Sequence, residues 1–153
     1  MIKASIAVFA VALLAGCAGP RYAGTAISPT VLSSKPQVVV VQDAATREGF
    51  KETVEGWLKD EGYSFIVVPE NTRHDHDKLT IEYVGKWSWD LALYLREAKI
   101  EGFHEGQRVG AVEFRSPNSL NFDKWGSGEG RIKYMLDVLF GKITVAEATK
   151  NVN

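Results

Sequence analysis

The chain has 153 residues, of which 45% are hydrophobic and 24% are charged. This composition is typical of one soluble globular domain and excludes a disordered, a collagen-like or a multi-span membrane protein. A single cysteine excludes an intrachain disulfide, and a formal net charge of -1 argues against a nucleic-acid-binding surface.

The first 16 residues have the pattern of a signal peptide. Lys3 gives a positive end, and the apolar run 4–14 that follows is shorter than the roughly 20 residues of a stable membrane span. The next residues, Leu14-Ala15-Gly16-Cys17, resemble the lipobox of bacterial lipoproteins. The resemblance implies cleavage between Gly16 and Cys17, a diacylglyceryl group on the Cys17 thiol, and acylation of the new amine, with palmitate expected. The alternatives are a secretory signal with a chance cysteine and an uncleaved apolar helix.

The lipobox resemblance also implies a location. Two or three acyl chains, at roughly 0.8 kcal/mol per buried CH₂, anchor a protein stably in a membrane. Ala18 follows the cysteine, whereas Asp in that place is the inner-membrane retention signal of enteric bacteria. We therefore expect an outer-membrane lipoprotein on the periplasmic side, with the inner membrane as the alternative.

Composition divides the remaining chain. Residues 17–36 are expected to form the lipidated cysteine and a flexible tether, because they are rich in Ala, Gly, Ser, Thr and Pro. Residues 37–141 are expected to form one α/β domain. Residues 142–153 are expected to form a C-terminal tail, which adds a short helical turn or stays mobile.

The domain begins with a strand and a helix. Val38–Val41 is a β-branched run, typical of a central strand buried on both faces. A helix is predicted over residues 46–61, with Asp43 or Thr46 as its cap and Gly62 at its end. Its apolar stripe is Phe50, Val54, Trp57 and Leu58.

Four further strands and a second helix follow. The strands are predicted over residues 63–68, 79–89, 91–103 and 108–114, with a hairpin turn at Glu105-Gly106 and a bulge at Gly85. After a polar loop over 116–130, a helix is predicted from Glu129 to Phe140. The order β-α-β-β-β-β-α predicts an α/β (α+β) fold. We expect a two-layer sandwich, with a mainly antiparallel five-stranded sheet and two helices on one face.

Two segments carry weak signals for ligand chemistry. His74 and His76 could bind a metal ion with a further ligand such as His104, but a solvated loop is the favoured interpretation. The glycine-rich run 126–130 could hold phosphate at a helix start, but it lacks the known phosphate-binding fingerprints and is interpreted as a connecting loop. No catalytic triad is evident. We therefore expect a protein that is not an enzyme and has no metal or other cofactor.

The aromatic strand around Trp87 and Trp89 is the most unusual local composition. Both side chains share a face with Leu79, Ile81 and Tyr83, so the core under the helices is the favoured location. The alternative is stacking on sugars or on a partner. Tyr94 and Arg96 are expected on the other, open face, where they would suit contact with a protein.

Three segments together resemble a family of small proteobacterial lipoproteins of unassigned function. They are Trp87-Ser88-Trp89-Asp90-Leu91, the hairpin at Gly106, and Ser119-Leu120-Asn121-Phe122-Asp123-Lys124-Trp125. The resemblance covers about residues 79–140 and the lipobox. It implies an anchored α/β domain without known catalysis, and Cys17 as the one functional residue.

These observations predict a lipid-anchored periplasmic binding or assembly module. Its partners would be the membrane, through the N-terminal lipid, and an envelope protein, but not a nucleic acid. A domain that binds a small ligand or an envelope glycan is the first alternative, and a metal-dependent enzyme is the second.

Overall fold

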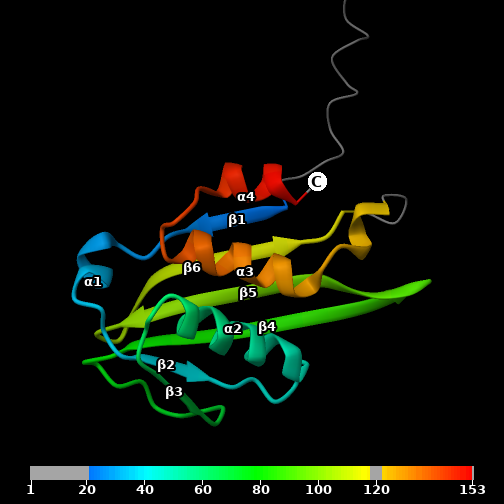
Figure 1. The fold of residues 1–153 in the computed structure, drawn as a ribbon. Coiled ribbons are helices and arrows are strands. Elements are labelled where there is room, and N and C mark those ends of the chain that lie inside the picture. The colour runs from blue at the N-terminus through cyan, green and yellow to red at the C-terminus, as the bar shows by residue number, and fades with distance from the viewer. Residues whose placement is uncertain (1–20, 118–121, 153) are drawn as a thin grey trace, which may run out of the picture.

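The computed structural model of the chain describes residues 21–117 and 122–152. Within them, one six-stranded sheet has the order β1-β6-β5-β4-β2-β3 (Figure 1). The strands are β1 (Tyr22–Thr25), β2 (Val38–Val41), β3 (Phe65–Val68), β4 (Leu79–Asp90), β5 (Ala92–His104) and β6 (Gln107–Arg115). The helices are α1 (Pro29–Ser33), α2 (Glu48–Asp60), α3 (Gly128–Leu139) and α4 (Val145–Asn151), with a 3-10 helix, η1 (Phe122–Trp125).

The first predicted strand–helix pair is confirmed. All four residues of β2 are buried, and the strand lies between β3 and β4, parallel to both. Helix α2 crosses between the neighbouring parallel strands β2 and β3, and its predicted stripe from Phe50 to Leu58 is buried. Burial of that stripe against the sheet stabilises a helix whose other face is polar.

The start of α2 differs from the prediction. The N-cap position is occupied by Arg47, without a side-chain cap hydrogen bond. Thr46 instead donates a hydrogen bond from Oγ1 to Asp43 Oδ2 (2.5 Å) and accepts one from the backbone N–H of Gly85 (2.9 Å). These two residues therefore join the helix start to β4 rather than capping the helix.

The meander β4-β5-β6 matches the predicted strands within a residue or two at each end. Glu105 and Gly106 have φ values of 52° and 75°, as expected for a two-residue hairpin turn. The β4–β5 register shifts between Lys86 and Trp87, so the predicted bulge lies next to Gly85 rather than at it. Gly85 instead leaves room for the Phe50 ring, since a Cβ at this position would lie 2.8 Å from that ring.

The predicted tether is wrong for the described residues up to position 36. β1 pairs with β6, and Tyr22 and Ile27 are 0% and 1% exposed. The Ile27 N–H donates a hydrogen bond to the Leu139 carbonyl at 2.7 Å. The burial of two large apolar side chains holds this Gly- and Pro-containing segment in the domain, although its composition is that of a linker.

The C-terminal segment adds the short helix α4 beside β1 (Figure 1). Thr144 and Glu147 form a capping box at its start, and Ala148 is buried. The helical alternative for the tail is therefore the correct one for residues 145–151.

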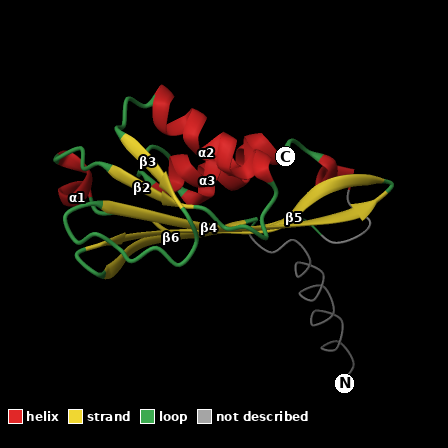
Figure 2. Ribbon diagram, turned by 90° about the horizontal axis from the view of Figure 1, so that it is seen from below, coloured by secondary structure: helices red, strands yellow, loops and turns green. Residues whose placement is uncertain are grey.

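The architecture is mixed α/β, with α2 and α3 on the same face of the sheet (Figure 2). In the described residues, the predicted five strands and two helices become six strands and four α-helices. β1 and α1 were not expected, and α4 is the helical alternative for the C-terminal tail. In the part of the chain that the structure describes, no helix is long and apolar enough to cross a membrane. The predicted signal peptide with Gly16 and Cys17 lies outside the described residues.

Candidate functional site

The β4–β5 hairpin projects beyond the rest of the sheet (Figures 1 and 2). β2 pairs only with the first four residues of β4, and β6 ends at Arg115, opposite Glu97. Beyond Glu97, the two strands pair with each other as far as Asp90 and Ala92. The last part of the hairpin therefore lies outside the helix-covered core.

Three large apolar side chains near the end of this hairpin are exposed. Trp89, Leu91 and Leu93 are 72%, 82% and 45% exposed, and Trp89 lies directly opposite Leu93. We call these three residues the apolar tip. A soluble surface exposes single apolar residues commonly, but a contiguous group is typical of a contact site.

The bulge in the hairpin explains why Leu93 and Trp89 share a face. Glu97 pairs with Lys86 and Leu95 pairs with Trp87, so Arg96 is an extra residue in β5. The extra residue shifts the alternation of side chains by one. Leu95 consequently faces the core, 0% exposed, and Leu93 continues that face outward beyond the helices.

A polar network supports the apolar tip from the side of η1. The Lys124 ammonium, on a side chain only 2% exposed, pairs with the carboxylate of Asp90. Trp125 donates a hydrogen bond from Nε1 to the Asp90 carbonyl at 2.7 Å. Arg131, 3% exposed, donates to the carbonyls of Lys124 (2.8 Å) and Leu95 (3.3 Å). The network holds η1, the hairpin and α3 together.

A groove of about 530 Å³ lies between the hairpin and the starts of α2 and α3. Trp87 and Leu93 contribute its hairpin wall, and Gly128 and Glu129 line it from α3. At the start of α3, the Ser127 hydroxyl accepts a hydrogen bond from the Gly130 N–H at 3.0 Å. The glycine-rich run is thus a connecting loop with a helix cap, and one N–H that could bind phosphate is already satisfied.

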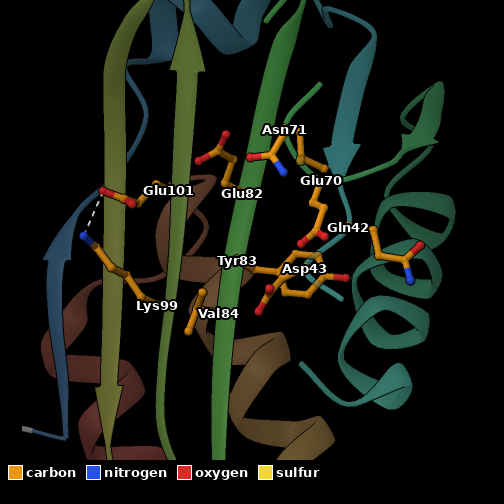
Figure 3. A pocket seen from close by; sticks show the side chains of 10 residues that line it. Gln42, Asp43, Glu70, Asn71, Glu82, Tyr83, Val84, Lys99 and Glu101 are labelled. Carbon is orange, nitrogen blue, oxygen red and sulfur yellow. Dashed lines mark ion pairs between the residues drawn. The ribbon is translucent and has the colours of Figure 1, made fainter. Parts of the chain in front are cut away.

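A second depression, of about 300 Å³, lies on the helix-free side of the sheet where β2 and β3 end (Figure 3). We call it the acidic depression, because four carboxylates line it: Asp43, Glu70, Glu82 and Glu101. Lys99 also lines it, but its ammonium pairs with Glu101 at 2.9 Å. The excess of carboxylates favours a positively charged group in this depression.

Tyr83 reaches the acidic depression from the core. Its ring stacks on Phe50 with a centroid distance of 4.6 Å and an interplanar angle of 6°. Burial raises the pKa of Tyr83, so the phenol stays protonated at neutral pH. Tyr83 can therefore donate a hydrogen bond here but does not act as a base.

The two histidines considered as metal ligands have other contacts. His74 Nε2 lies 2.7 Å from Glu82 Oε1, and the His74 ring packs on Phe103. His76 lies over Gly106, where a Cβ would approach its ring to 3.2 Å. Across residues 21–117 and 122–152, no group of three or more His, Cys, Asp or Glu side chains is arranged to hold a metal ion.

The two tryptophans of β4 have different environments. Trp87 packs on the core, with its ring centroid 6.2 Å from that of Phe50, whereas Trp89 is exposed. The favoured core interpretation is therefore right for Trp87 and wrong for Trp89. The helices do not extend over the outer part of the hairpin, so they cover the strand face that Trp87 and Trp89 share only in part.

Tyr94 and Arg96 lie on the hairpin as well. Tyr94 is half-buried, and its ring centroid is 5.8 Å from Lys124 Nζ. Arg96 is exposed, with Nε 3.8 Å from Glu97 Oε1. No role for Lys124 or Arg131 was predicted from the sequence, and the one available signal was the aromatic residue Trp125 directly after Lys124.

Comparison with known proteins adds little to this geometry. No protein-family model and no curated protein matches the chain. One solved structure, a minor lipoprotein from Acinetobacter baumannii, is similar to this chain with a TM-score of 0.33 and 10% sequence identity. The match covers 77% of this chain and 90% of that protein.

Proposed function

We propose that this protein is a lipid-anchored lipoprotein of the bacterial envelope that acts as a non-catalytic binding or assembly module. The observation that carries the proposal is Leu14-Ala15-Gly16-Cys17 at the end of a signal-peptide pattern. The outer membrane, on the periplasmic side, is the proposed location, and the inner membrane is the alternative.

The start of β1 supports anchoring close to the membrane. Arg21 is the first described residue, four positions after Cys17. Four extended residues span at most about 14 Å. A lipid on Cys17 would therefore hold the folded domain against the bilayer surface rather than at the end of a long tether.

The acidic depression is the proposed contact for an envelope protein. Its carboxylates come from four separate segments of the chain and lie on the face that the helices leave uncovered (Figure 3). A partner that presents Lys or Arg side chains would complement this charge. Tyr94 and Arg96 are proposed as further contacts on the hairpin.

Metabolic labelling with an alkyne fatty acid tests the anchor. We expect the wild-type chain to incorporate the label and Cys17→Ala to lack it. Cys17→Ala should also keep the signal peptide, since lipidation precedes cleavage in the lipoproteins that carry a lipobox. Equal labelling of the two chains would disprove lipidation at Cys17.

Crosslinking in intact cells, followed by mass spectrometry, tests the partner. We expect one dominant envelope protein, lost when Glu70→Lys and Glu82→Lys are combined. Glu52→Lys with Asp60→Lys is the matched control, because it makes the same change in net charge on α2. The proposed contact would be contradicted if both double variants lost the crosslinked protein equally, or if the wild type gave no crosslinked partner above background.

A glycan-binding function is the second candidate, favoured by the groove beside Trp87. Titration with soluble cell-wall fragments should then change the tryptophan fluorescence of the wild type but not of Trp87→Phe. An unchanged signal in the wild type would remove this candidate.

A further inference from the structure

The apolar tip and the N-terminal end of the domain lie at the same end of the sheet (Figure 1). β1 runs antiparallel to β6, with Tyr22 opposite Phe114. The Arg115 N–H donates a hydrogen bond to the Arg21 carbonyl at 2.8 Å, and Arg115 lies opposite Glu97. From Tyr22 back to Arg21, the first described residue, the chain therefore runs toward the end of the hairpin that carries the tip.

The distance from the sheet to the tip can be compared with the distance from the sheet to Cys17. Leu91 lies six residues beyond Glu97 along β5, which is about 20 Å at roughly 3.3 Å per residue. Cys17 lies four residues beyond Arg21, and this segment spans at most about 14 Å. A membrane that holds a lipid on Cys17 consequently lies within reach of the tip when the strands stand upright on it.

The chemistry of the tip fits the boundary between lipid headgroups and acyl chains. Tryptophan is enriched at membrane–water interfaces, where its ring is apolar and its N–H stays hydrated. Leu91 and Leu93 supply aliphatic surface beside Trp89. Lys86 and Arg96 are exposed cations farther back on the hairpin, where both lie within 4 Å of Glu97. Lys86 is three residues from Trp89, about 10 Å along β4, a distance over which anionic lipid still attracts a cation.

We propose that the apolar tip inserts into the same membrane leaflet that holds the Cys17 lipid. The proposal rests on the lipid anchoring put forward above. The domain then touches the bilayer at two points, and the strands stand on the membrane. The acidic depression stays in water, because Glu82 lies seven residues from Trp89 along β4, about 23 Å from the bilayer.

Depth-dependent quenching of tryptophan fluorescence tests the insertion directly. Lipidated protein is purified from membranes and reconstituted in vesicles of phosphatidylethanolamine and phosphatidylglycerol that contain doxyl-labelled lipid. We expect quenching in the wild type and its loss in Trp89→Phe, which keeps Trp57, Trp87 and Trp125. Equal quenching in the two proteins, or no quenching in either, would overturn the proposal.

Vesicle flotation of the unlipidated mature chain separates the tip from the anchor. Cys17→Ser is floated alone, with the tip substitutions Trp89→Ser, Leu91→Ser and Leu93→Ser, or with Ile66→Ser and Val67→Ser. The last pair removes exposed apolar surface from the edge strand β3, which β2 separates from the start of β4 and which lies far from the tip. We expect the tip variant to bind vesicles at least tenfold more weakly, and the edge variant to bind as Cys17→Ser does.

The outcomes distinguish the two proposals and the other possible occupants of the tip. A wild-type chain that incorporates no fatty-acid label in cells would end the anchoring proposal, while tip-dependent flotation of Cys17→Ser would still support insertion. Equal flotation of the tip and edge variants would overturn insertion. A dimer that dissociates in the tip variant, or a Trp89 response to cell-wall fragments instead of vesicles, would also overturn it. Unchanged thermal unfolding midpoints would show that all variants are folded.

Discussion

Lys124 pairs with Asp90 although its side chain is only 2% exposed. The pair joins η1 to the end of β4, and the Trp125 indole strengthens the connection through the Asp90 carbonyl. The Lys124 ammonium also lies 4.8 Å from the centroid of the Trp125 ring. The ion pair, the indole hydrogen bond and the cation–π contact therefore attach η1 to the end of the projecting hairpin.

Removal of the carboxylate should destabilise the protein. Asp90→Ala removes the carboxylate that pairs with the buried Lys124 ammonium, and we expect the free energy of unfolding to fall by about 1–3 kcal/mol. The effects of Asp90→Ala and Lys124→Met should not add in the double variant, because each substitution removes the same ion pair. Urea unfolding measures the stability of the single and double variants. A double variant that loses the sum of the two single effects would contradict this account.

The pairing of β1 with β6 can be tested at Gly24. Its φ is 145°, and a Cβ would lie 2.1 Å from the Ala111 carbonyl oxygen. Because backbone atoms cannot yield as a flexible side chain does, we expect Gly24→Ala to lower the free energy of unfolding by at least about 2 kcal/mol. Gly49→Ala is the matched control in α2, where no atom lies within 4 Å of the added Cβ. It should be neutral or stabilising by up to about 1 kcal/mol. A neutral Gly24→Ala would mean that residues 22–25 are a tether after all.

Stability should depend on pH through the capping box of α4. Hydrogen bonds from the backbone N–H (2.7 Å) and hydroxyl (2.9 Å) of Thr144 lower the pKa of Glu147 from its ordinary 4.5. A carboxyl with a lowered folded-state pKa stabilises fully above pH 4.5, and this contribution is lost as the pH falls through the folded-state value. Glu147→Gln can keep the box without a titrating group. The variant should therefore lose less stability than the wild type in thermal unfolding between pH 6 and pH 3, and an identical loss would refute the role of Glu147.

The contact between α2 and α3 includes one side-chain hydrogen bond. Trp57 donates it from Nε1 to Asp137 Oδ1 at 2.9 Å, and the Trp57 ring packs on Phe140. We expect a double-mutant cycle of Trp57→Phe and Asp137→Ala to give a coupling energy of about 1 kcal/mol in urea unfolding. Additive single effects would show that the hydrogen bond contributes nothing to stability.

The elements predicted well are those whose side-chain pattern repeats over several residues. The stripe of α2 and the alternation along β4 from Leu79 to Tyr83 each show which side of the element is apolar. That side is the buried one in the structure. β1 has only the sequence Tyr-Ala-Gly-Thr, with one large apolar side chain. Four residues are too few to show an alternation of apolar and polar side chains. Only the pairing with β6 identifies this segment as a strand.

The candidate site was harder to predict than the core. Lys124 and Arg131 are charged residues in a polar or helical stretch, and a sequence pattern places such residues on the surface. They are buried because η1 folds back against the hairpin and α3, which brings Asp90 and the carbonyl groups of Leu95 and Lys124 to them. Asp90 and Leu95 lie 34 and 36 positions from the residues that they contact, and a local pattern does not report such partners.

The sequence by itself determined the signal-peptide pattern that ends at Cys17 and the apolar faces of the main strands and helices. Both depend on neighbouring residues alone. Only the tertiary structure decided that Trp87 packs on the core and Trp89 is exposed, because Phe50 of α2 contacts the Trp87 ring and the helices do not extend over the outer hairpin. Strand order likewise decided that β1 starts at the same end of the sheet as the apolar tip. The pairing of β1 with β6 joins residues about 90 positions apart, and no local periodicity encodes contacts at that separation.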